Sequence, residues 1–371
     1  MTHIDLAATP QTTAFAELLD SGATPHELVL YRGVVTPREL DAPAAESAAL
    51  AIAAAGHDLG WLRRVAVRGE DRFRWLSGMV TNMVTDLGKN CGAWNLVLNA
   101  QGRIQGDLTV WHEGDQLELE IDADQYDRLL AHLERFIIMD DVELVPLAGE
   151  AALGLTGPAV EEVLARVGLP VLSWPMTSTR VEWNGMDLRI AREYGATAAH
   201  YALWAPQQQL GKLWMYLRTA GAAPVGSASL EAFRIAEGIP AYGIDMVERD
   251  LPQETSQMRA LHFSKGCYLG QEIVERIRSR GNVHRHLRHL ELSGPVPAAG
   301  TELALEGYTA AGHITSAAEL PLASGSRVFA LAMMRGEAEA HNGTFAYTVK
   351  AATAGGLAGT ARILPAPPSF S

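Results

Sequence analysis

The sequence predicts an α+β fold with a small β-barrel domain at its C-terminal end. Over the first 284 residues, short alternating apolar runs mix with runs of helical periodicity, which favours α+β layers over a doubly wound parallel sheet. After about residue 285, short apolar runs alternate with Gly and Pro turns and no long helical stripe remains, as in small barrels. We therefore expect an α+β region over residues 1–284, with two halves of similar rhythm, and a β-barrel domain over residues 285–371.

Length, composition and charge narrow the class of protein. The chain has 371 residues, more than one hydrophobic core usually holds, which indicates two or three domains. Hydrophobic residues make up 48% and charged residues 20%, as in packed globular proteins. The formal net charge of -13 repels phosphate backbones, so we expect no direct DNA partner. The two ends, Met1–Gln11 and Pro365–Ser371, are expected to fray.

Periodicity and turn residues predict the individual elements. The strongest local signal is Asn184-Gly185 between two apolar runs, which predicts a tight hairpin. Leu117, Leu119 and Ile121 alternate with carboxylates, as in a half-exposed strand. The predicted helices are Ala42–Gly56 with Gly56 as its stop, Glu70–Met79, Asp124–Ile137 with Asp122 as its cap, Gly157–Val167, Pro206–Ala220 and Ser227–Glu237. The predicted strands include Val65–Gly69, Trp94–Leu98, Ile104–Val110, Arg180–Trp183, Leu188–Ala191, Leu287–Leu292, Glu302–Leu305, Val328–Met333 and Phe345–Val349.

The cysteine content and the N-terminal sequence bear on the compartment. Cys91 and Cys267 are the two cysteines, too few for a disulfide framework or for a standard iron–sulfur site within one chain. Met1–Pro10 shows neither the basic start nor the apolar run of a signal peptide. The longest apolar stretch, Ala42–Gly56, contains Glu46 and is too short to span a bilayer. These features predict a cytoplasmic protein with no membrane partner.

The segment Lys265-Gly-Cys-Tyr-Leu-Gly-Gln-Glu272 carries the densest group of unusual residues. It reads as a glycine-containing loop that feeds a helix over Gln271–Arg278, with Cys267 just before the helix start and Lys265 two residues away. A helix N-terminus and a nearby cation both favour thiolate over thiol. Cys267 could therefore be a nucleophile, a redox sensor or one ligand of a shared metal cluster. The spacing alone favours a buried, structural cysteine beside a solvated lysine.

This segment resembles the K-G-C-Y-x-G-Q-E signature of the YgfZ family of folate-binding proteins, which assist iron–sulfur enzymes. Its flanks, Leu251-Pro-Gln-Glu254 and Arg276 to Gly281, are similar to the family as well. Further stretches resemble the wider aminomethyltransferase superfamily: Val67 to Asn82, Asn99 to Leu108, Arg234 to Gly238 with Gly243 and Asp245, and Gly312 to Ser316. The resemblance implies two intertwined α+β subdomains that form a ring-like body around a folate pocket, followed by a C-terminal barrel.

The resemblance also implies residues for a tetrahydrofolate site. A carboxylate or an amide can accept hydrogen bonds from the edge of a pterin, apolar side chains pack on its ring, and Arg or Lys binds a glutamate tail. Glu237 matches the superfamily carboxylate that contacts the pterin, and Asp107 matches the aspartate that supports methylene transfer. We expect Asp107 and Cys267 to carry any chemistry, at one shared cavity. The remaining candidates for cofactor binding are Asn82, Arg103, Tyr242, Lys265, Tyr268 and Arg276.

The run from Arg276 to His289 is basic within an acidic protein. It could bind the folate tail, an acidic protein or RNA, although an interdomain strip of ion pairs is the favoured interpretation. His284, His286 and His289 share no spacing with a carboxylate or a cysteine, so we expect no zinc site and no stably bound metal.

The resemblance implies a tetrahydrofolate-binding accessory protein for iron–sulfur enzyme assembly or repair, including enzymes that modify tRNA. Its partners would be folate and iron–sulfur client or assembly proteins. The alternative is a tetrahydrofolate-dependent transferase of aminomethyl or other one-carbon units, in which Asp107 is the charged partner. A third possibility is a binding module without catalysis, in which folate only stabilises a docking surface.

Overall fold

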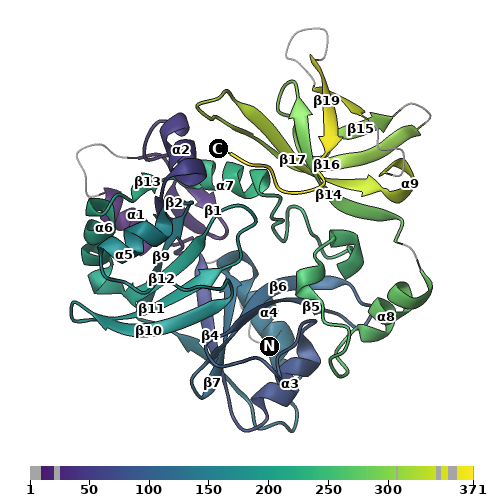
Figure 1. Cartoon of the computed structure of the whole chain (residues 1–371). Helices are drawn as coiled ribbons and strands as arrows, with labels where there is room; N and C mark the ends of the chain where they lie inside the picture. Colours follow the sequence, from purple (N-terminus) through teal and green to yellow (C-terminus); the bar gives the residue numbers. More distant parts are fainter. Residues whose placement is uncertain are drawn as a thin grey trace.

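A computed structural model describes residues 10–20, 26–281, 283–305, 308–339, 344–349 and 357–370. The expected loose end at Met1–Gln11 falls largely outside these residues. Figure 1 shows two sheets that face each other, with helices on their outer sides, and a barrel that stands apart from them. The fold is thus the predicted α+β body with a C-terminal β-barrel.

The first sheet contains the hairpin predicted around Asn99–Gly102. Its strand order is β5 (Gly92–Leu98), β6 (Ile104–Glu113), β7 (Gln116–Asp122), β4 (Leu62–Arg68) and β8 (Glu143–Leu147), all antiparallel. Helices α3 (Arg72–Met79) and α4 (Ala123–Glu134) cover its outer face. Apolar residues on alternate positions of β4, β6 and β7 pack against Leu76, Leu129 and Leu133 of these helices, as the strand and helix periods require.

The second sheet has the order β10 (Thr177–Trp183), β11 (Met186–Glu193), β12 (His200–Pro206), β9 (Glu150–Thr156), β3 (Ala55–Asp58) and β13 (Ala223–Val225). Only the β3–β13 pair is parallel among the described strands of this sheet. Its outer face packs on α1 (Ala14–Asp20), α5 (Val160–Arg166) and α6 (Leu210–Thr219). A small hairpin, β1 (Leu28–Tyr31) and β2 (Val34–Pro37), lies beside the two sheets.

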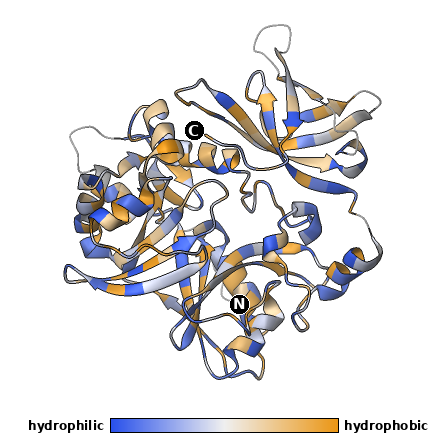
Figure 2. Ribbon diagram, in the orientation of Figure 1, coloured by the Kyte–Doolittle hydropathy of each residue, from blue (hydrophilic) through white to orange (hydrophobic). Residues whose placement is uncertain are grey.

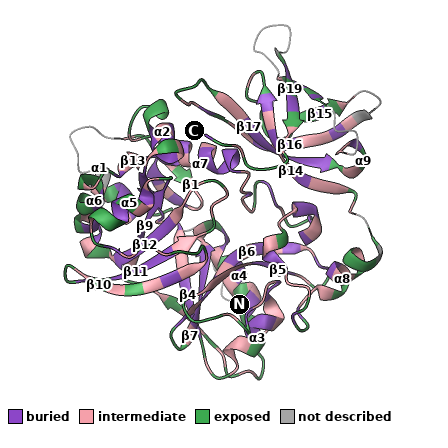
Figure 3. Cartoon of the chain, viewed as in Figure 1, coloured by how far each residue is buried: buried purple, intermediate pink, exposed green. Residues whose placement is uncertain are grey.

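The inner faces of the two sheets bury charged side chains. Glu118 and Glu120 of β7 are 1% and 6% exposed, so the expected half-exposed strand is wrong. The face of β7 that carries Glu118 and Glu120 lies against the second sheet, and two buried arginines neutralise the charges of these carboxylates. Figure 2 shows hydrophilic positions alternating with apolar ones along these strands, and Figure 3 shows that both kinds are buried there.

Each of the two arginines reaches from one sheet to the other. Arg64 of β4 pairs with Glu118 and with Glu150 of β9, and its guanidinium stacks 4.7 Å from the ring centre of Trp204 on β12. Arg189 of β11 crosses in the opposite direction and is fully buried. Its Nε donates to Glu113 at 2.7 Å and it stacks 4.8 Å from the ring centre of Trp111, both on β6. The two sheets are therefore joined by buried charges as well as by apolar contacts.

Local turn chemistry confirms some predicted boundaries and corrects others. Trp183 pairs with Met186, so Asn184 and Gly185 form a two-residue loop with φ of 50° and 74°, the geometry that this dipeptide favours. The helix expected over Ala42–Gly56 ends earlier, as α2 (Pro43–Ile52), and Gly56 lies in β3. A Cβ on Gly56 would lie 2.3 Å from the Trp214 ring, so this glycine permits close packing and does not stop a helix.

The C-terminal strands close into a barrel. Their order is β14 (Arg285–Ser293), β17 (Arg327–Arg335), β16 (Tyr308–Leu320), β15 (Glu302–Leu305), β18 (Phe345–Val349) and β19 (Leu357–Ile363), with the one-turn helix α9 (Gly336–Glu339) beside them. The preceding segment holds α7 (Ser227–Ala236), the short turns Pro252–Thr255 and Met258–Ala260, and α8 (Gln271–Arg280). Where one domain ends and the next begins stays a prediction, since α7 packs on both the second sheet and the barrel.

The C-terminal tail is not frayed over its described residues. After β19 the chain runs back to α7, where Phe370 is 9% exposed and its ring centre lies 5.3 Å from that of Phe233 and 6.0 Å from that of Phe329. The Pro-rich composition suggested a frayed end, but it does not show that Phe370 packs into an apolar cluster, and this burial holds the segment in place.

The buried arginines make a prediction about stability. Replacing Arg189 by Met should lower the free energy of unfolding by about 3–5 kcal/mol, because Glu113 and Glu120 would remain buried without their cation. The matched change at Arg180, which is 38% exposed and forms ion pairs of 3.4–3.9 Å, should cost less than about 1 kcal/mol. Urea unfolding of both variants measures the difference, and equal losses would contradict the role given to Arg189.

Candidate functional site

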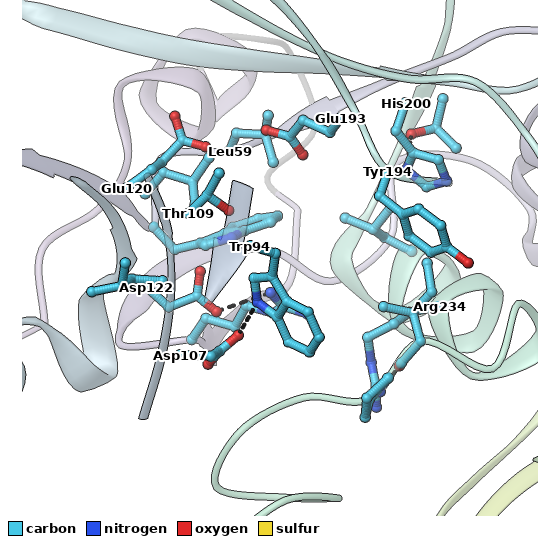
Figure 4. A pocket seen from close by; sticks show the side chains of 18 of the residues that line it. Leu59, Trp94, Asp107, Thr109, Glu120, Asp122, Glu193, Tyr194, His200 and Arg234 are labelled. Carbon is cyan, nitrogen blue, oxygen red and sulfur yellow. Dashed lines mark hydrogen bonds and ion pairs between the residues drawn. The ribbon is translucent and has the colours of Figure 1, made fainter. Parts of the chain in front are cut away.

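A cavity of about 220 Å³ lies between the inner faces of the two sheets. Strands β6 and β7 contribute one wall, the ends of β11 and β12 another, and α7 and the β1–β2 turn complete it. In Figure 4, Trp94 lies between Asp107 and Asp122 on one side and Tyr194 and Arg234 on the other. Trp61, Trp94, Trp111 and Tyr194 supply flat apolar surface, which suits an aromatic ring system with a few polar contacts.

Asp107 projects into this cavity from β6 and is held from two sides. Its Oδ2 accepts a hydrogen bond from Trp94 Nε1 at 2.9 Å, and its Oδ1 accepts one from Gln125 Nε2 at 3.0 Å. The Asp107 backbone N–H donates to Gln125 Oε1 at 3.1 Å. A carboxylate oriented by both a strand and a helix is preorganised to face a ligand.

Glu237 also lines the cavity, but the protein already uses its carboxylate. Oε1 accepts hydrogen bonds from the backbone N–H and hydroxyl of Thr197 and from the Ala198 N–H, at 2.8–3.1 Å. Oε2 lies 2.7 Å from Nε2 of His200. Burial opposes both charges, yet the ion pair raises the pKa of His200 and lowers the pKa of Glu237. The expected pterin carboxylate is therefore occupied with holding His200 and the turn before β12.

Glu193, at the end of β11, is a carboxyl group with spare hydrogen-bonding capacity in the cavity. Its Oε1 is buried and has no hydrogen-bond partner among the described residues. Burial, and next the negative charge of Glu120, raise the pKa of Glu193 to about 8, while His200 and Arg189 oppose the shift. At neutral pH this group is mainly a neutral acid, and a ligand that donates hydrogen bonds would favour its ionised form.

A chain of ion pairs connects the cavity to the barrel. Arg234 of α7 pairs with Glu231 and with Asp245, the latter at 2.7 Å. Asp245 in turn accepts hydrogen bonds from the hydroxyls of Thr315 and Ser316 on β16, both at 2.6 Å. Arg32 in the β1–β2 turn pairs with Asp122 at 2.9 Å, which explains why Asp122 occupies the cap position of α4 without capping it.

Comparison with known proteins bears on this arrangement. The GCVT N-terminal domain family matches residues 27–265, which is more than half of the chain. The chain belongs to the GCVT N-terminal domain family. The aminomethyltransferase of Rubrobacter xylanophilus is 28% identical over 273 residues, covering 72% of this chain and 73% of the relative. The tRNA-modifying protein YgfZ of Yersinia pseudotuberculosis is 26% identical over 265 residues, covering 69% of this chain and 78% of the relative.

A solved structure shares the fold over nearly the whole chain. The glycine cleavage system aminomethyltransferase T of Bartonella henselae superposes with a TM-score of 0.83 at 18% identity, covering 98% of this chain and 100% of the other. At that identity the likeness shows the fold alone. It confirms the predicted arrangement of α+β body and barrel for this member of the GCVT N-terminal domain family.

Of the seven predicted cofactor-binding residues, only Glu237 lines the cavity of this GCVT family member, and the other six lie outside it. Asn82 stands behind the wall, where its Nδ2 donates to the backbone oxygens of Trp94 and Arg259 at 3.0 and 2.8 Å. Arg103 donates to the Arg249 carbonyl, and Tyr242 packs under Arg128. Asn82 thus positions two cavity residues, while Arg103 and Tyr242 do not line the cavity.

The motif segment forms a loop against the ends of α3 and the β5–β6 hairpin. Lys265 is 6% exposed, and its Nζ donates to the carbonyls of Ser77, Val80 and Asn82 at 2.5–2.8 Å. Burial lowers the pKa of Lys265 to about 7, and the three carbonyls oppose this shift because they stabilise the ammonium. Lys265 therefore fastens the loop, and the expected solvated charge is wrong.

Cys267 is exposed on this loop and does not line the cavity. The expectation that its thiol meets Asp107 and Glu237 at one cavity is therefore not met, and neither is the structural expectation of a buried thiol. Tyr268 is buried beside Leu96 and Val274, and Arg276 lies exposed on α8. Of the three residues expected to meet at one cavity, Asp107 and Glu237 line it and Cys267 does not.

The basic run divides between two roles. Arg285 pairs with Asp250 and Glu254 at 2.8 and 2.9 Å, and Arg288 pairs with Glu339. Arg285 thus joins the start of the barrel region to the segment that precedes it, as expected of an ion-pair strip, whereas the Arg288–Glu339 pair lies within residues 285–371. In the first half, Arg278 stacks on Phe263 and is half-exposed beside Glu275.

Several cavity residues were missed from the sequence. Glu193, His200 and Arg259 lie in strand ends and a short turn without a motif, so only the tertiary arrangement reveals them. In the part of the chain that the structure describes, no group of three or more His, Cys, Asp and Glu side chains is arranged to hold a metal ion. None of the described helices is both long and apolar enough to cross a membrane.

The contacts of Lys265 predict a large effect on stability. Replacing it by Met should lower the free energy of unfolding by about 2–4 kcal/mol, because three buried carbonyls lose a charged donor. Lys212, which is exposed and donates to the Asn184 carbonyl, is the matched control and should change it by less than about 0.5 kcal/mol. Denaturant unfolding measures both, and a tolerated Lys265→Met would show that the loop is held by other contacts.

Proposed function

We propose that the cavity binds tetrahydrofolate, with the pterin ring between the inner faces of the two sheets. Membership of the GCVT N-terminal domain family supports this, as does a relative named aminomethyltransferase. The observation that carries the proposal is the combination of aromatic walls with inward-facing carboxyl groups in one cavity. A flat, hydrogen-bond-donating heterocycle matches both features.

Within that proposal, Glu193 takes the role first expected of Glu237. The amino-pyrimidine edge of a pterin presents paired N–H donors, which an ionised carboxylate can accept. Glu193 has a buried oxygen without a hydrogen-bond partner among the described residues, whereas both oxygens of Glu237 are engaged by Thr197, Ala198 and His200. Glu237 would then act indirectly, by fixing His200 in the wall.

We further propose that the protein serves iron–sulfur enzymes as a folate-dependent accessory factor, including enzymes that modify tRNA. Support comes from the Lys265–Glu272 segment and from the relative named tRNA-modifying protein YgfZ. Because Cys267 is exposed and away from the cavity, its thiol would meet a client or assembly protein and not the folate. Two free cysteines suit a reducing cytoplasm.

The second candidate is transfer of an aminomethyl or other one-carbon unit. Asp107 favours it, because this carboxylate faces the cavity and is held by Trp94 and Gln125. In that reaction Asp107 would stabilise positive charge that develops on the folate nitrogens. The first of the relatives described above bears the name of such an enzyme.

Folate binding should depend on pH through Glu193. If the bound ligand requires ionised Glu193, binding releases a proton below the free pKa of about 8. The affinity for tetrahydrofolate should then rise about tenfold per pH unit between pH 6 and pH 8 and level off above. Anaerobic titration monitored by tryptophan fluorescence measures it, since three tryptophans line the cavity.

The Glu193→Gln variant should bind more weakly at pH 8 and lose this pH dependence. Glu182→Gln, an exposed change on β10, should retain both. Absence of saturable binding in the wild type up to millimolar ligand would remove the basis for the proposed function. If the affinity of Glu193→Gln for tetrahydrofolate still depended on pH, folate binding would stand, but Glu193 would not be the group whose ionisation controls it.

The two candidate activities make opposite predictions for two substitutions. An accessory role requires the exposed thiol, so Cys267→Ser should fail to restore iron–sulfur enzyme activity in cells that lack the protein, while Asp107→Asn should restore it. A transferase requires the cavity carboxylate, so Asp107→Asn should lower methylene-tetrahydrofolate formation by about 100-fold or more, while Cys267→Ser should not. Full complementation by the double variant would instead favour a binding module without catalysis.

A further inference from the structure

Three polar side chains lie in one row across the second sheet. Thr156 of β9 is the Cα partner of His200 on β12, and His200 is the Cα partner of Glu193 on β11. Residues paired in this way on neighbouring antiparallel strands project from the same face of a sheet. All three line the cavity, and Figure 4 shows the Glu193 and His200 side chains there. His200 therefore has Glu193 as its neighbour on one side and Thr156 on the other.

His57 of β3 extends this row, because a glycine on the next strand leaves room for its ring. A Cβ on Gly154 of β9 would lie 1.9 Å from Cε1 of His57, so a larger residue there would displace the imidazole. Nε2 of His57 lies 3.0 Å from Thr156 Oγ1, and its Nδ1 lies 3.0 Å from the carbonyl oxygen of Asp58. The Thr156 hydroxyl is thus shared between two histidines.

The hydrogen bonds of this chain require one proton more than its neutral groups supply. Thr156 Oγ1 lies 3.2 Å from His200 Nδ1, and His200 Nε2 lies 2.7 Å from Glu237 Oε2. With the two contacts of His57, four hydrogen bonds join the Asp58 carbonyl to the Glu237 carboxylate, and both of these ends only accept. A neutral imidazole brings one N–H and a hydroxyl brings one O–H, so two neutral histidines and a threonine supply three protons.

The fourth proton belongs to His200. Burial lowers the pKa of His57 to about 4, and the charges of His200 and Arg32 add to this shift, so His57 is neutral. Its Nδ1 donates to a carbonyl, so its Nε2 is the acceptor and must receive the Thr156 proton. Thr156 Oγ1 then accepts from His200 Nδ1. Burial opposes both charges of the His200–Glu237 pair, yet the pairing raises the pKa of His200 and lowers that of Glu237. His200 therefore donates through both nitrogens, as an imidazolium cation.

The charges that face Glu193 come from three strands. Burial and the charge of Glu120 on β7 oppose the ionisation of Glu193, whereas His200 on β12 and Arg189 on its own strand favour it. Arg189 is already committed to Glu113 at 2.7 Å and to Glu120 at 3.5 Å. His200 is thus the cation directly opposite Glu193 on the neighbouring strand. Loss of its charge would raise the pKa of Glu193 further, because a nearby opposite charge favours the ionised form.

We propose that His57 and Thr156 are positioning residues that keep His200 doubly protonated, and that the His200 cation favours the ionised form of Glu193 which a hydrogen-bond-donating ligand requires. Thr156 accepts the Nδ1 proton of His200, and His57 fixes the Thr156 hydroxyl in the orientation that allows this. The part that concerns the ligand rests on the proposed function, because it assumes that the bound folate donates to Glu193. The charge of His200 can be measured without any ligand.

NMR of the full-length protein with isotope-labelled histidine tests the chain of hydrogen bonds. The chemical shifts of the ring nitrogens distinguish an imidazolium from either neutral tautomer, and the His200→Gln variant identifies the His200 signals. In the wild type at pH 7, His200 should be doubly protonated and His57 should be neutral with its proton on Nδ1. Thr156→Val removes the shared hydroxyl at nearly constant volume, so His200 should titrate at a lower pH, and Thr156→Ser should restore the wild-type titration. A neutral His200 in the wild type would overturn the inference.

Anaerobic titration with tetrahydrofolate at two pH values tests the effect on the cavity. Thr156→Val should weaken binding about 3- to 10-fold at pH 7, because less of Glu193 is ionised, and less than about twofold at pH 9.5, where Glu193 is ionised in both proteins. In a Glu193→Gln background, Thr156→Val should have no pH-dependent effect. Thr219→Val removes an exposed hydroxyl on α6 that donates to the Met215 carbonyl, and it should behave as the wild type.

The outcomes separate this inference from the proposed function. An equal loss of affinity at both pH values in Thr156→Val would show a structural role and overturn the inference, while folate binding would stand. A wild type that binds tetrahydrofolate with a neutral His200 would overturn it as well. Absence of tetrahydrofolate binding in the wild type would reject the proposed function and with it the part of the inference that concerns the ligand, and the NMR result would still decide the charge of His200.

Discussion

The two arginines that cross between the sheets set the geometry on which the site depends. Arg64 pairs with Glu118 of its own sheet and reaches Glu150 and the Trp204 ring of the other, and Arg189 reaches back to carboxylates and the Trp111 ring of the first sheet. Sheets that pack through apolar side chains alone close on each other and leave little polar space. Here the inner layer is lined with Glu113, Glu118 and Glu120, and the cations fix the separation at which these charges are tolerated.

That separation explains why one end of the layer can hold a polar cavity. Along β6 and β7 the inward positions continue from paired glutamates to Asp107 and Asp122, which lie at the cavity. Asp122 is balanced by Arg32, and Glu237 by His200. What remains unbalanced, the Glu193 carboxyl and the Arg259 guanidinium, is confined to the space where a ligand would lie. A shifted pKa in a cavity, together with a buried oxygen that lacks a partner at Glu193 and a cation without an ion pair at Arg259, identifies a candidate functional site among the described residues.

Much of the fold, and less of the site, could be predicted from the sequence. The Asn184-Gly185 hairpin, the β5–β6 hairpin and the all-β C-terminal region follow from local turn chemistry and periodicity, so they were found. The alternation of residues in β7 predicted a strand, but it did not predict that the carboxylate face is buried. Alternation shows which side chains share a face of the strand and does not show what packs against that face. Phe370 escaped notice for a similar reason, since its contacts are with residues far away in the chain.

At the site, the resemblance led to Asp107 and Glu237, and both line the cavity. The role of Glu237 could not be read from its position in the chain, because its partners Thr197 and His200 lie on another element. Lys265 and Cys267 are two residues apart, yet one is buried under three carbonyls and the other is exposed. Their closeness in the sequence predicted that Lys265 would act on the Cys267 thiol. The two side chains leave the loop in different directions, so this prediction is not supported.

The return of the C-terminal segment has a practical consequence for how the molecule can be handled. Pro365 and Pro367 border a second cavity, and Phe370 packs on Phe233, whose ring centre lies 6.4 Å from that of His200. Phe370 therefore contacts a residue of the wall of the first cavity, Phe233. A fluorophore attached within residues 365–370 would therefore respond to, and disturb, occupancy of the interior, so labels are better placed elsewhere on the surface.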